Sequence, residues 1–298
     1  MKKSYNLWPF NFGAVHNQDF KKSRVVIVQI PYESTVSFNT GTSTGPHTII
    51  ANSRYLDEML DAVDGNNLVG LKSTDVFTID EIEISKNSVK EAMAGVEQAI
   101  REEVLHYGKF PLILGGEHSI SYGALKAIKK RYSNVSVLQF DAHTDLLNEY
   151  EGSKYSHACV MRRVYDMHIP VTAVGIRNIN QEGEAFIKSK KIKSIHYAPG
   201  IPPIDRLLKT LTKNVYITFD LDALDPSIMP SVGTAEPGGL YWHEVIQTIS
   251  ELAKYVHIIG ADVVELKPIP GLDAPDFLAA KLTYQLIKSI LASNEKKV

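Results

Sequence analysis

Short apolar runs rich in valine and isoleucine alternate along this chain with longer segments of helical periodicity. This alternation is typical of βα units built around a mainly parallel sheet. Several of the runs lack polar alternation, as expected when helices cover both faces of the sheet. The pattern predicts a three-layer α/β/α fold with strands over Arg24–Ile30, Phe110–Leu114, Val135–Phe140, Val171–Gly175, Ser194–His196, Val215–Phe219 and His257–Val264.

Between these runs, apolar residues recur every three or four positions, which is the spacing of a core-facing helix. The spacing predicts helices over Ser88–Tyr107, Ser121–Tyr132, His243–Val256 and Ala274–Ala292. The last of these has Asp273 as a candidate N-cap and Pro275 in its first turn. The segment Ser34–Thr48 is rich in serine and threonine, and we expect it to form a loop over a site.

The chain of 298 residues shows no repeat, low-complexity segment or Pro/Gly/Ser linker. We therefore expect one domain spanning residues 1–298, which is long enough to bury a substantial core. The single cysteine, Cys159, excludes an intramolecular disulfide and a cysteine-based zinc or iron–sulfur site. It also favours a reducing compartment.

Charge and hydropathy argue against two classes of partner, nucleic acids and membranes. The 32 basic and 34 acidic side chains are interspersed and give a net charge of −2, so we expect no nucleic-acid partner. No stretch approaches the ~20 apolar residues that span a bilayer, which predicts no membrane partner. Two lysines near the amino terminus are not followed by an apolar segment, so we expect no signal peptide and a cytoplasmic location.

A motif of aspartates and histidine follows the predicted strand Val135–Phe140. Asp141, His143 and Asp145 occupy alternate positions there. Because alternate residues of an extended chain point to the same side, the three side chains can converge on one point. A polar loop that happens to follow a strand would show the same residues.

The pattern recurs at two other strand ends, which favours a site over a polar loop. Asp220 and Asp222 follow the strand Val215–Phe219, and His118 follows a pair of glycines after Phe110–Leu114. Carboxylates at the end of a buried strand repel one another and resist desolvation, so such a cluster needs a cation. Because the carboxyl ends of parallel strands border one crevice, we expect the three motifs to meet.

Four aspartates and two histidines are too many donors for one catalytic zinc ion, which usually takes three protein ligands. They suit two metal ions that share bridging carboxylates. Oxygen-rich ligation with imidazole and no thiolate favours Mn²⁺, with Zn²⁺, Fe²⁺ and Co²⁺ as alternatives. A two-metal centre holds hydroxide at neutral pH and stabilises charge on both sides of a displacement, so the predicted reaction is a hydrolysis.

Two further polar residues are candidates for the same crevice. His157 lies in a segment that contains glycine and serine, where it could shuttle protons near neutral pH or be an ordinary surface histidine. Glu265 ends the strand His257–Val264, where it could pair with a cationic substrate or be a solvated carboxylate.

In order and spacing, four motifs resemble the signatures of the ureohydrolases, the family of arginase and agmatinase. These motifs are Gly115-Gly116-Glu117-His118-Ser119, Asp141-Ala142-His143-Thr144-Asp145, Asp220-Leu221-Asp222-Ala223-Leu224-Asp225-Pro226 and Asp262-Val263-Val264-Glu265. The resemblance extends from about Ile30 to the final helix. It implies an arginase-like fold, a small cationic guanidine substrate and, by analogy with the family, a homo-oligomer that is a trimer or hexamer.

The resemblance also implies a role for each site residue. Two Mn²⁺ ions per subunit would be bound by His118 and Asp145, by His143 and Asp222, and by Asp141 and Asp220 as bridges. A hydroxide between the ions would attack the guanidinium carbon, and Asp145 would orient it and pass its proton to the leaving nitrogen. His157 matches the family's proton shuttle. Glu265 matches the carboxylate that pairs with the guanidinium, which a carboxylate fork holds best.

Two of the departures from the commoner pattern of the family bear on the candidate site. Glu117 stands where aspartate is usual, and we expect it to keep a hydrogen bond to the ligand histidine. Leu147 stands where arginases usually carry the asparagine that helps to bind the substrate's carboxylate. Because leucine cannot hydrogen-bond a carboxylate, agmatine is favoured over arginine. Glu149 and Glu151 could attract the distal ammonium of the substrate, or be solvated loop charges.

The predicted function is therefore that of a manganese-dependent agmatinase, which cleaves agmatine to putrescine and urea. Hydrolysis of aminopropyl-agmatine, arginine or guanidinobutyrate is the alternative within the family. A two-metal phosphoesterase is an alternative of a different class, but it would need cationic groups for phosphate, and the candidate crevice residues are acidic. A metal-binding scaffold without catalysis is a third, and the presence of all six ligands, His157 and Glu265 argues against it.

Overall fold

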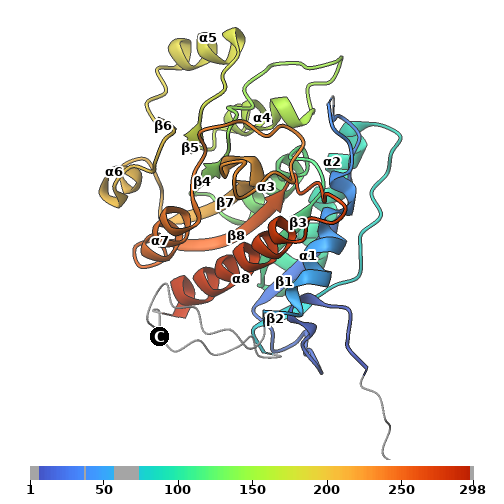
Figure 1. Ribbon diagram of the computed structural model, residues 1–298. Coiled ribbons are helices and arrows are strands. Elements are labelled where there is room, and N and C mark those ends of the chain that lie inside the picture. The colour runs from blue at the N-terminus through green and yellow to red at the C-terminus, as the bar shows by residue number, and fades with distance from the viewer. Residues whose placement is uncertain (1–6, 37, 57–73, 296–298) are drawn as a thin grey trace, which may run out of the picture.

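Eight strands form one parallel sheet at the centre of the computed structural model, which describes residues 7–36, 38–56 and 74–295 (Figure 1). The strand order is β2-β1-β3-β8-β7-β4-β5-β6, and each neighbouring pair is parallel. The strands are β1 (Val25–Ile30), β2 (Val76–Thr78), β3 (Phe110–Gly115), β4 (Val135–Phe140), β5 (Val171–Ile176), β6 (Ile195–Tyr197), β7 (Asn214–Asp220) and β8 (His257–Val264).

Helices cover both faces of this sheet, so the predicted three-layer α/β/α fold is confirmed (Figure 1). One apolar core joins the sheet to α1 (Gly45–Ser53), α6 (Ile204–Leu208), α7 (Trp242–Leu252) and α8 (Ala274–Glu295). The other joins it to α2 (Val89–Ala99), α3 (Ile120–Arg131), α4 (Val160–Asp166) and α5 (Gln181–Lys190).

The apolar runs that predicted the strands are buried on both sides. All six residues of β1 are buried, with Val25 and Ile27 in one core and Val26 and Val28 in the other. This alternation explains why the strand has no polar face. All seven predicted strands are present, and the eighth, β2, is a three-residue segment whose pairing in the sheet is with β1.

Two sequence predictions need correction. The segment expected as one helix over Ser88–Tyr107 is α-helical only to Ala99, and continues as a π-helical turn (Ile100–Val104) and a 3-10 turn (Leu105–Tyr107). The loop expected over Ser34–Thr48 gives way to a 3-10 turn at Thr42–Thr44 and then to α1, because Pro46 fits the first turn of a helix.

The order of the strands brings distant segments of the chain together. Strands β3 and β4 are consecutive in sequence, but β8 and β7 lie between them in the sheet. The carboxyl ends of these four strands are therefore neighbours, and the crevice beyond such a reversal of strand order is where α/β proteins bind ligands. The register aligns them closely, because Phe219 pairs with both Phe140 and Val263.

Among the described residues, no helix is both long and apolar enough to cross a membrane. Residues 1–6, on which the expectation of no signal peptide rests in part, lie outside the described residues.

Candidate metal centre

The predicted ligands lie at the carboxyl ends of β3, β4 and β7. His118 follows the turn after β3, where Gly116 allows a close approach of two backbones. A Cβ atom at Gly116 would lie 2.0 Å from the carbonyl oxygen of Tyr32, so a larger residue does not fit there. Asp141 directly follows β4, and Asp220 is the last residue of β7.

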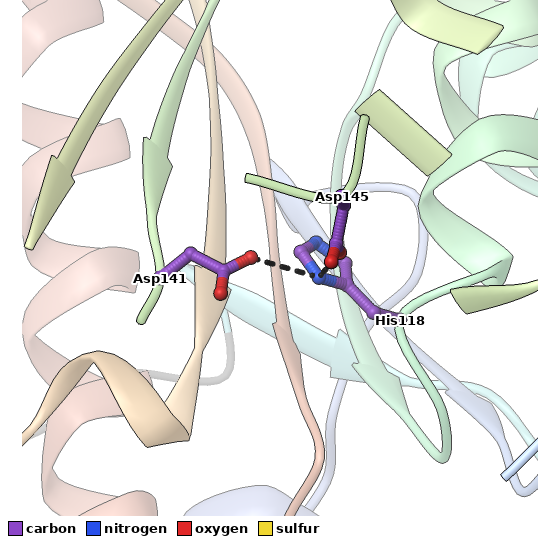
Figure 2. A group of neighbouring side chains, drawn as sticks. All are labelled: His118, Asp141 and Asp145. Atoms are coloured by element: carbon purple, nitrogen blue, oxygen red, sulfur yellow. Dashed lines mark ion pairs between the residues drawn. The ribbon is translucent and has the colours of Figure 1, made fainter. Parts of the chain in front are cut away.

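One group of donors surrounds the buried imidazole of His118 (Figure 2). Its Nδ1 lies 3.1 Å from Asp145 Oδ2, 3.3 Å from Asp141 Oδ2 and 3.3 Å from Asp220 Oδ2. This nitrogen is buried and, within the part of the chain that the structure describes, has no hydrogen-bond partner. An unpaired nitrogen among three carboxylate oxygens is the arrangement that a bound cation would complete.

A second group lies around His143 and shares a residue with the first. His143 Nδ1 is 2.9 Å from Asp222 Oδ2 and 3.7 Å from Asp141 Oδ1. Asp141 thus presents one oxygen to each histidine, but its Oδ1 also accepts a hydrogen bond from the His143 N–H at 2.6 Å and its Oδ2 one from the Gln139 amide at 2.8 Å, so its bridging role stays a prediction. Asp220 presents Oδ2 to His118, while its Oδ1 accepts a hydrogen bond from the Asp222 N–H at 2.9 Å, so its bridging role stays a prediction.

Buried side chains hold the far side of the His118 ring. Its Nε2 lies 2.8 Å from the Thr218 hydroxyl, which in turn donates to Asp262 at 2.7 Å. Tyr216 donates to the other oxygen of the same carboxylate at 2.9 Å. Because Thr218 gives its proton to Asp262, it accepts from His118 Nε2–H, and this leaves the Nδ1 lone pair facing the three aspartates.

The backbone beneath the second group is held differently, by Arg177. Its guanidinium donates to the carbonyl oxygens of Asp222 at 2.7 Å, Ala223 at 3.3 Å and Glu236 at 2.7 Å. The Asp222 side chain also accepts a hydrogen bond from the Ala142 N–H at 2.9 Å, which links the β7 and β4 motifs. Arg177 therefore fixes the position of the loop that carries Asp222.

Sequence reasoning missed Thr218, Asp262 and Arg177 as supporting residues. A signal existed for the first two, since a polar residue inside a strand that is buried on both faces needs a hydrogen-bond partner. Arg177 gave no such signal, because its partners at Asp222 and Glu236 are 45 and 59 residues away.

Burial and mutual repulsion shift the pKa values of the cluster. Burial and the charges of Asp145 and Asp222 raise the pKa of Asp141 to about 7. Burial and the Asp222 charge raise the pKa of Asp220 as well. Burial opposes the charged form of His143, yet the charge of Asp222 raises its pKa to about 11. Carboxylates this close are all ionised only when cations balance them, so the residues present fit a metal pair.

A cavity of about 230 Å³ opens above the cluster. Seven of the eight predicted site residues line it, while Asp141 lies fully buried: the lining set is His118, His143, Asp145, His157, Asp220, Asp222 and Glu265. Val36, Phe38 and Asn39 also line it, so part of the serine- and threonine-rich segment does border a site. Leu147, Glu149 and Glu151 are not among the lining residues.

Glu265 is fixed at the junction of β8 and β3. Its Oε1 accepts a hydrogen bond of 2.7 Å from the His118 N–H, and its own N–H donates to Gly116 at 2.9 Å. Burial raises the pKa of Glu265 to about 8. Both Glu265 and Asp145 have left-handed backbone conformations, with φ values of 68° and 50°.

The expected hydrogen bond from Glu117 to the ligand histidine is wrong. Glu117 instead accepts hydrogen bonds from the backbone N–H groups of Ser34 and Thr35 and from the hydroxyls of Thr35 and Ser119. These donors use both carboxylate oxygens, and the His118 ring bonds to Thr218 in its place. His157 lies next to the loop that carries Ser34 and Thr35, with its Nδ1 3.0 Å from the Thr35 hydroxyl.

The fold and the site define an α/β protein with a candidate two-metal centre at the sheet's topological switch point. Residues 23–288 match the model of the arginase family, and the chain belongs to that family. The predicted resemblance to the ureohydrolases and the arginase-like fold are thereby confirmed.

Relatives of known name cover most of the chain. The N(1)-aminopropylagmatine ureohydrolase of Synechocystis sp. is 34% identical over 94% of this chain and 93% of its own length. An agmatinase of Bacillus anthracis is 33% identical over 84% of this chain and 86% of its own. A crystal structure of the agmatine ureohydrolase of Thermoplasma volcanium aligns with a TM-score of 0.82 at 28% identity, covering 99% of this chain and 98% of that one.

Proposed function

We propose that this protein is a manganese-dependent agmatinase that hydrolyses agmatine to putrescine and urea. The observation that carries the proposal is the pair of donor groups sharing Asp141 beneath a cavity walled by Glu265. His118 and Asp145 would hold one ion and His143 and Asp222 the other, with Asp141 and Asp220 between them. When bound, the two ions activate water at neutral pH and stabilise the charge that develops in the reaction.

Each side chain of the site then has its own role in hydrolysis of the substrate. Glu265 pairs with the guanidinium, whose planar geometry matches a carboxylate fork. Asp145 orients the attacking water, takes its proton and passes it to the leaving nitrogen, so that urea and an amine separate. His157 moves protons between the cavity and solvent, since its side chain is only partly buried.

The lining of the cavity supports a substrate without a carboxylate or phosphate. Among the described lining residues there is no arginine or lysine to bind an anion. Leu147, which the family resemblance aligns with the asparagine of arginases, does not line the cavity and offers no side-chain hydrogen bond to a carboxylate. This favours agmatine over arginine, and it speaks against the phosphoesterase alternative.

Hydrolysis of aminopropyl-agmatine is the second candidate, because a relative 34% identical to this chain carries that name. The added aminopropyl group would extend the amine tail away from the guanidinium, so the same donor groups would serve both substrates.

For its cellular setting, we propose a cytoplasmic homo-oligomer, a trimer or hexamer as in the family, with a role in putrescine and polyamine biosynthesis. No nucleic-acid or membrane partner is part of the proposal.

Urea release tests this proposal directly. We expect the protein loaded with Mn²⁺ to release urea from agmatine faster than from aminopropyl-agmatine, arginine or guanidinobutyrate. A larger kcat/KM with aminopropyl-agmatine would replace agmatine by the second candidate. Absence of urea from all four, with turnover of a generic phosphate ester, would overturn the assignment.

The role of Glu265 is tested by Glu265→Gln. The amide keeps the shape but not the charge, so kcat/KM for agmatine should fall by about a hundredfold or more, as for loss of a charge-assisted pair. Metal content, measured by atomic emission, should stay the same. Glu184→Gln, at an exposed residue of α5 that pairs with Lys188 and lies outside the cavity lining, is the matched control and should keep full activity.

A further inference from the structure

A single hydroxyl joins the loop after β1 to the segment that carries His157. Thr35 Oγ1 lies 2.8 Å from Glu117 Oε1, 3.0 Å from His157 Nδ1 and 3.1 Å from the His157 backbone nitrogen. Thr35 and His157 are 122 residues apart in sequence. The same loop continues into Val36, which lines the cavity.

The direction of each hydrogen bond follows from the partners of Glu117. Its Oε2 accepts from the backbone N–H groups of Ser34 and Thr35, each at 2.7 Å. Its Oε1 accepts from the hydroxyls of Thr35 at 2.8 Å and Ser119 at 2.5 Å. Glu117 is fully buried, and four donors leave its oxygens acting only as acceptors. The one proton of the Thr35 hydroxyl is therefore committed to Glu117.

This commitment determines which nitrogen of His157 carries a proton. With its proton given to Glu117, Thr35 Oγ1 presents only lone pairs to the His157 backbone N–H and to Nδ1. Nδ1 must then be the protonated nitrogen of the neutral ring, and Nε2 is the nitrogen left to accept a proton. The Ser156 hydroxyl lies farther from Nδ1, at 3.3 Å, and Tyr150 packs edge-on against the ring at a centroid distance of 5.7 Å.

We propose that Thr35, oriented by Glu117, is a positioning residue that fixes His157 in the tautomer with Nδ1–H and so dedicates Nε2 to proton transfer. The inference rests on the proposed function, in which His157 moves protons during hydrolysis. It gives the glutamate at position 117 a task that differs from the one expected from sequence. That task is to orient a hydroxyl of the neighbouring loop.

Thr35→Val tests this inference because valine keeps the shape of threonine and removes the hydroxyl. Loss of a positioned proton shuttle lowers turnover by about ten- to a hundredfold, less than removal of a general acid or base outright. We expect kcat for agmatine to fall by that factor while KM changes less than about twofold, and Thr35→Ser to restore most of the loss. Thr44→Val, which removes an exposed hydroxyl bonded to Gly41 in the same segment, is the matched control.

A second measurement reads the tautomer without using activity. In ¹⁵N spectra of the imidazole rings, the His157 signals, assigned by their loss in His157→Gln, should show protonated Nδ1 and unprotonated Nε2 in the wild type. Thr35→Val should shift them toward a mixture of tautomers, and Thr44→Val should leave them unchanged.

The outcomes separate the two proposals. A wild type that releases no urea from any guanidine overturns the agmatinase assignment, and the NMR comparison then still decides the tautomer. An active wild type whose kcat and His157 signals are unchanged in Thr35→Val overturns the present inference. So does a fall in kcat that serine fails to restore and that accompanies a lower Tm, because it would show that Thr35 only stabilises the fold.

Discussion

The two histidines of the candidate metal centre are held in different ways. His118 has a side chain that is 1% exposed, and a chain of buried side chains through Thr218 and Asp262 holds its ring. His143 has a side chain that is 26% exposed, and its partner Asp222 sits on a loop whose backbone carbonyls are bonded by Arg177. One half of the centre is thus braced through a side chain and the other through the backbone.

We call these two supports the Thr218 brace and the Arg177 brace, and each controls a different property of the site. A hydrogen bond to a ligand ring sets its tautomer and basicity, so the Thr218 brace acts on metal affinity. Hydrogen bonds to loop carbonyls fix the position of the Asp222 carboxylate, so the Arg177 brace acts on the folded geometry of the loop. We expect the ion on the His143 side, which is nearer to solvent, to exchange faster than the ion on the His118 side.

The largest effect is expected from the residue that both halves share. Asp141→Asn replaces a carboxylate that faces both histidines with a neutral amide. Both ions should bind more weakly, and urea release should fall by about a thousandfold or more, because the two-metal centre acts as a unit. Metal analysis after dialysis and urea assays measure both effects. Asp276→Asn, at a buried carboxyl in the first turn of α8, is the matched control. Retention of one tightly bound ion would show that the halves are independent.

The backbone brace is broken by Arg177→Met, which keeps the apolar stem and removes the guanidinium. Several carbonyls lose their donor, so we expect a loss of about 3 kcal/mol of stability and a Tm lower by about 5 °C or more. In a chelator titration, the ion on the His143 side should be lost before the ion on the His118 side. Arg101→Met, at an exposed arginine paired with Glu102, should change neither property. Equal weakening of both ions would contradict the division between the braces.

The side-chain brace is broken by Thr218→Val. The substitution removes the acceptor of His118 Nε2–H without a change of shape. The affinity of the Mn²⁺ ion on the His118 side should fall by about ten- to a hundredfold. Because His118 Nε2–H and Asp262 each lose a buried partner, Tm should also fall, but by less than in Arg177→Met. Thr172→Val removes from β5 a buried hydroxyl that donates to Thr210, and so controls for the loss of a polar group. If Thr218→Val lowered Tm as much as Arg177→Met, the two braces would not differ in kind.

The smallest effect concerns the loop of Asp222 and depends on pH. Hydrogen bonds from Ser227, and from the N–H groups of Gly238 and Gly239, lower the pKa of Asp225 to about 2 from 3.8. A lowered folded-state pKa stabilises the protein above the unfolded value, and this contribution is lost as pH falls through about 2. After solvent screening, Asp225→Asn should lower stability by about 1 kcal/mol at pH 7, or Tm by about 2 °C. Thermal unfolding of both proteins from pH 7 to pH 3 should show the difference shrinking. A difference that stays constant would exclude the charge as its cause.

The elements that carry the ligands could be predicted because their signals are local. Strands β4 and β7 are apolar runs followed at once by alternating aspartates, and the neighbouring residues alone mark both strand and site. The parallel sheet then requires that such ends share one edge. The edge strand β2 could not be found in this way, because three residues are too short for a pattern.

The supporting residues escaped prediction because their partners are set by the tertiary fold. Glu117 was expected to act on the adjacent histidine, yet its partners Ser34 and Thr35 lie more than 80 residues away in sequence. Likewise, Arg177 acquires its role only when β5 brings it beside the loop of Asp222. Spacing along the chain indicates what a residue can bind, whereas its actual partner depends on which strands become neighbours.

At Asp145 and Glu265, the left-handed backbone conformation lowers the stability of the fold, while the side chain provides a carboxylate for the site. A residue with a side chain pays roughly 1 kcal/mol or more for a positive φ that glycine adopts freely. Glycine in place of Glu265 would also remove the acceptor of the His118 N–H, whereas glycine in place of Asp145 would relieve the repulsion with Asp141. Selection for heat resistance of the metal-free protein alone would therefore favour glycine in place of Asp145 and remove a carboxylate that faces the cavity. Variants recovered from such a selection should gain thermal tolerance and lose turnover together, so this position is a poor choice for engineering a more robust enzyme.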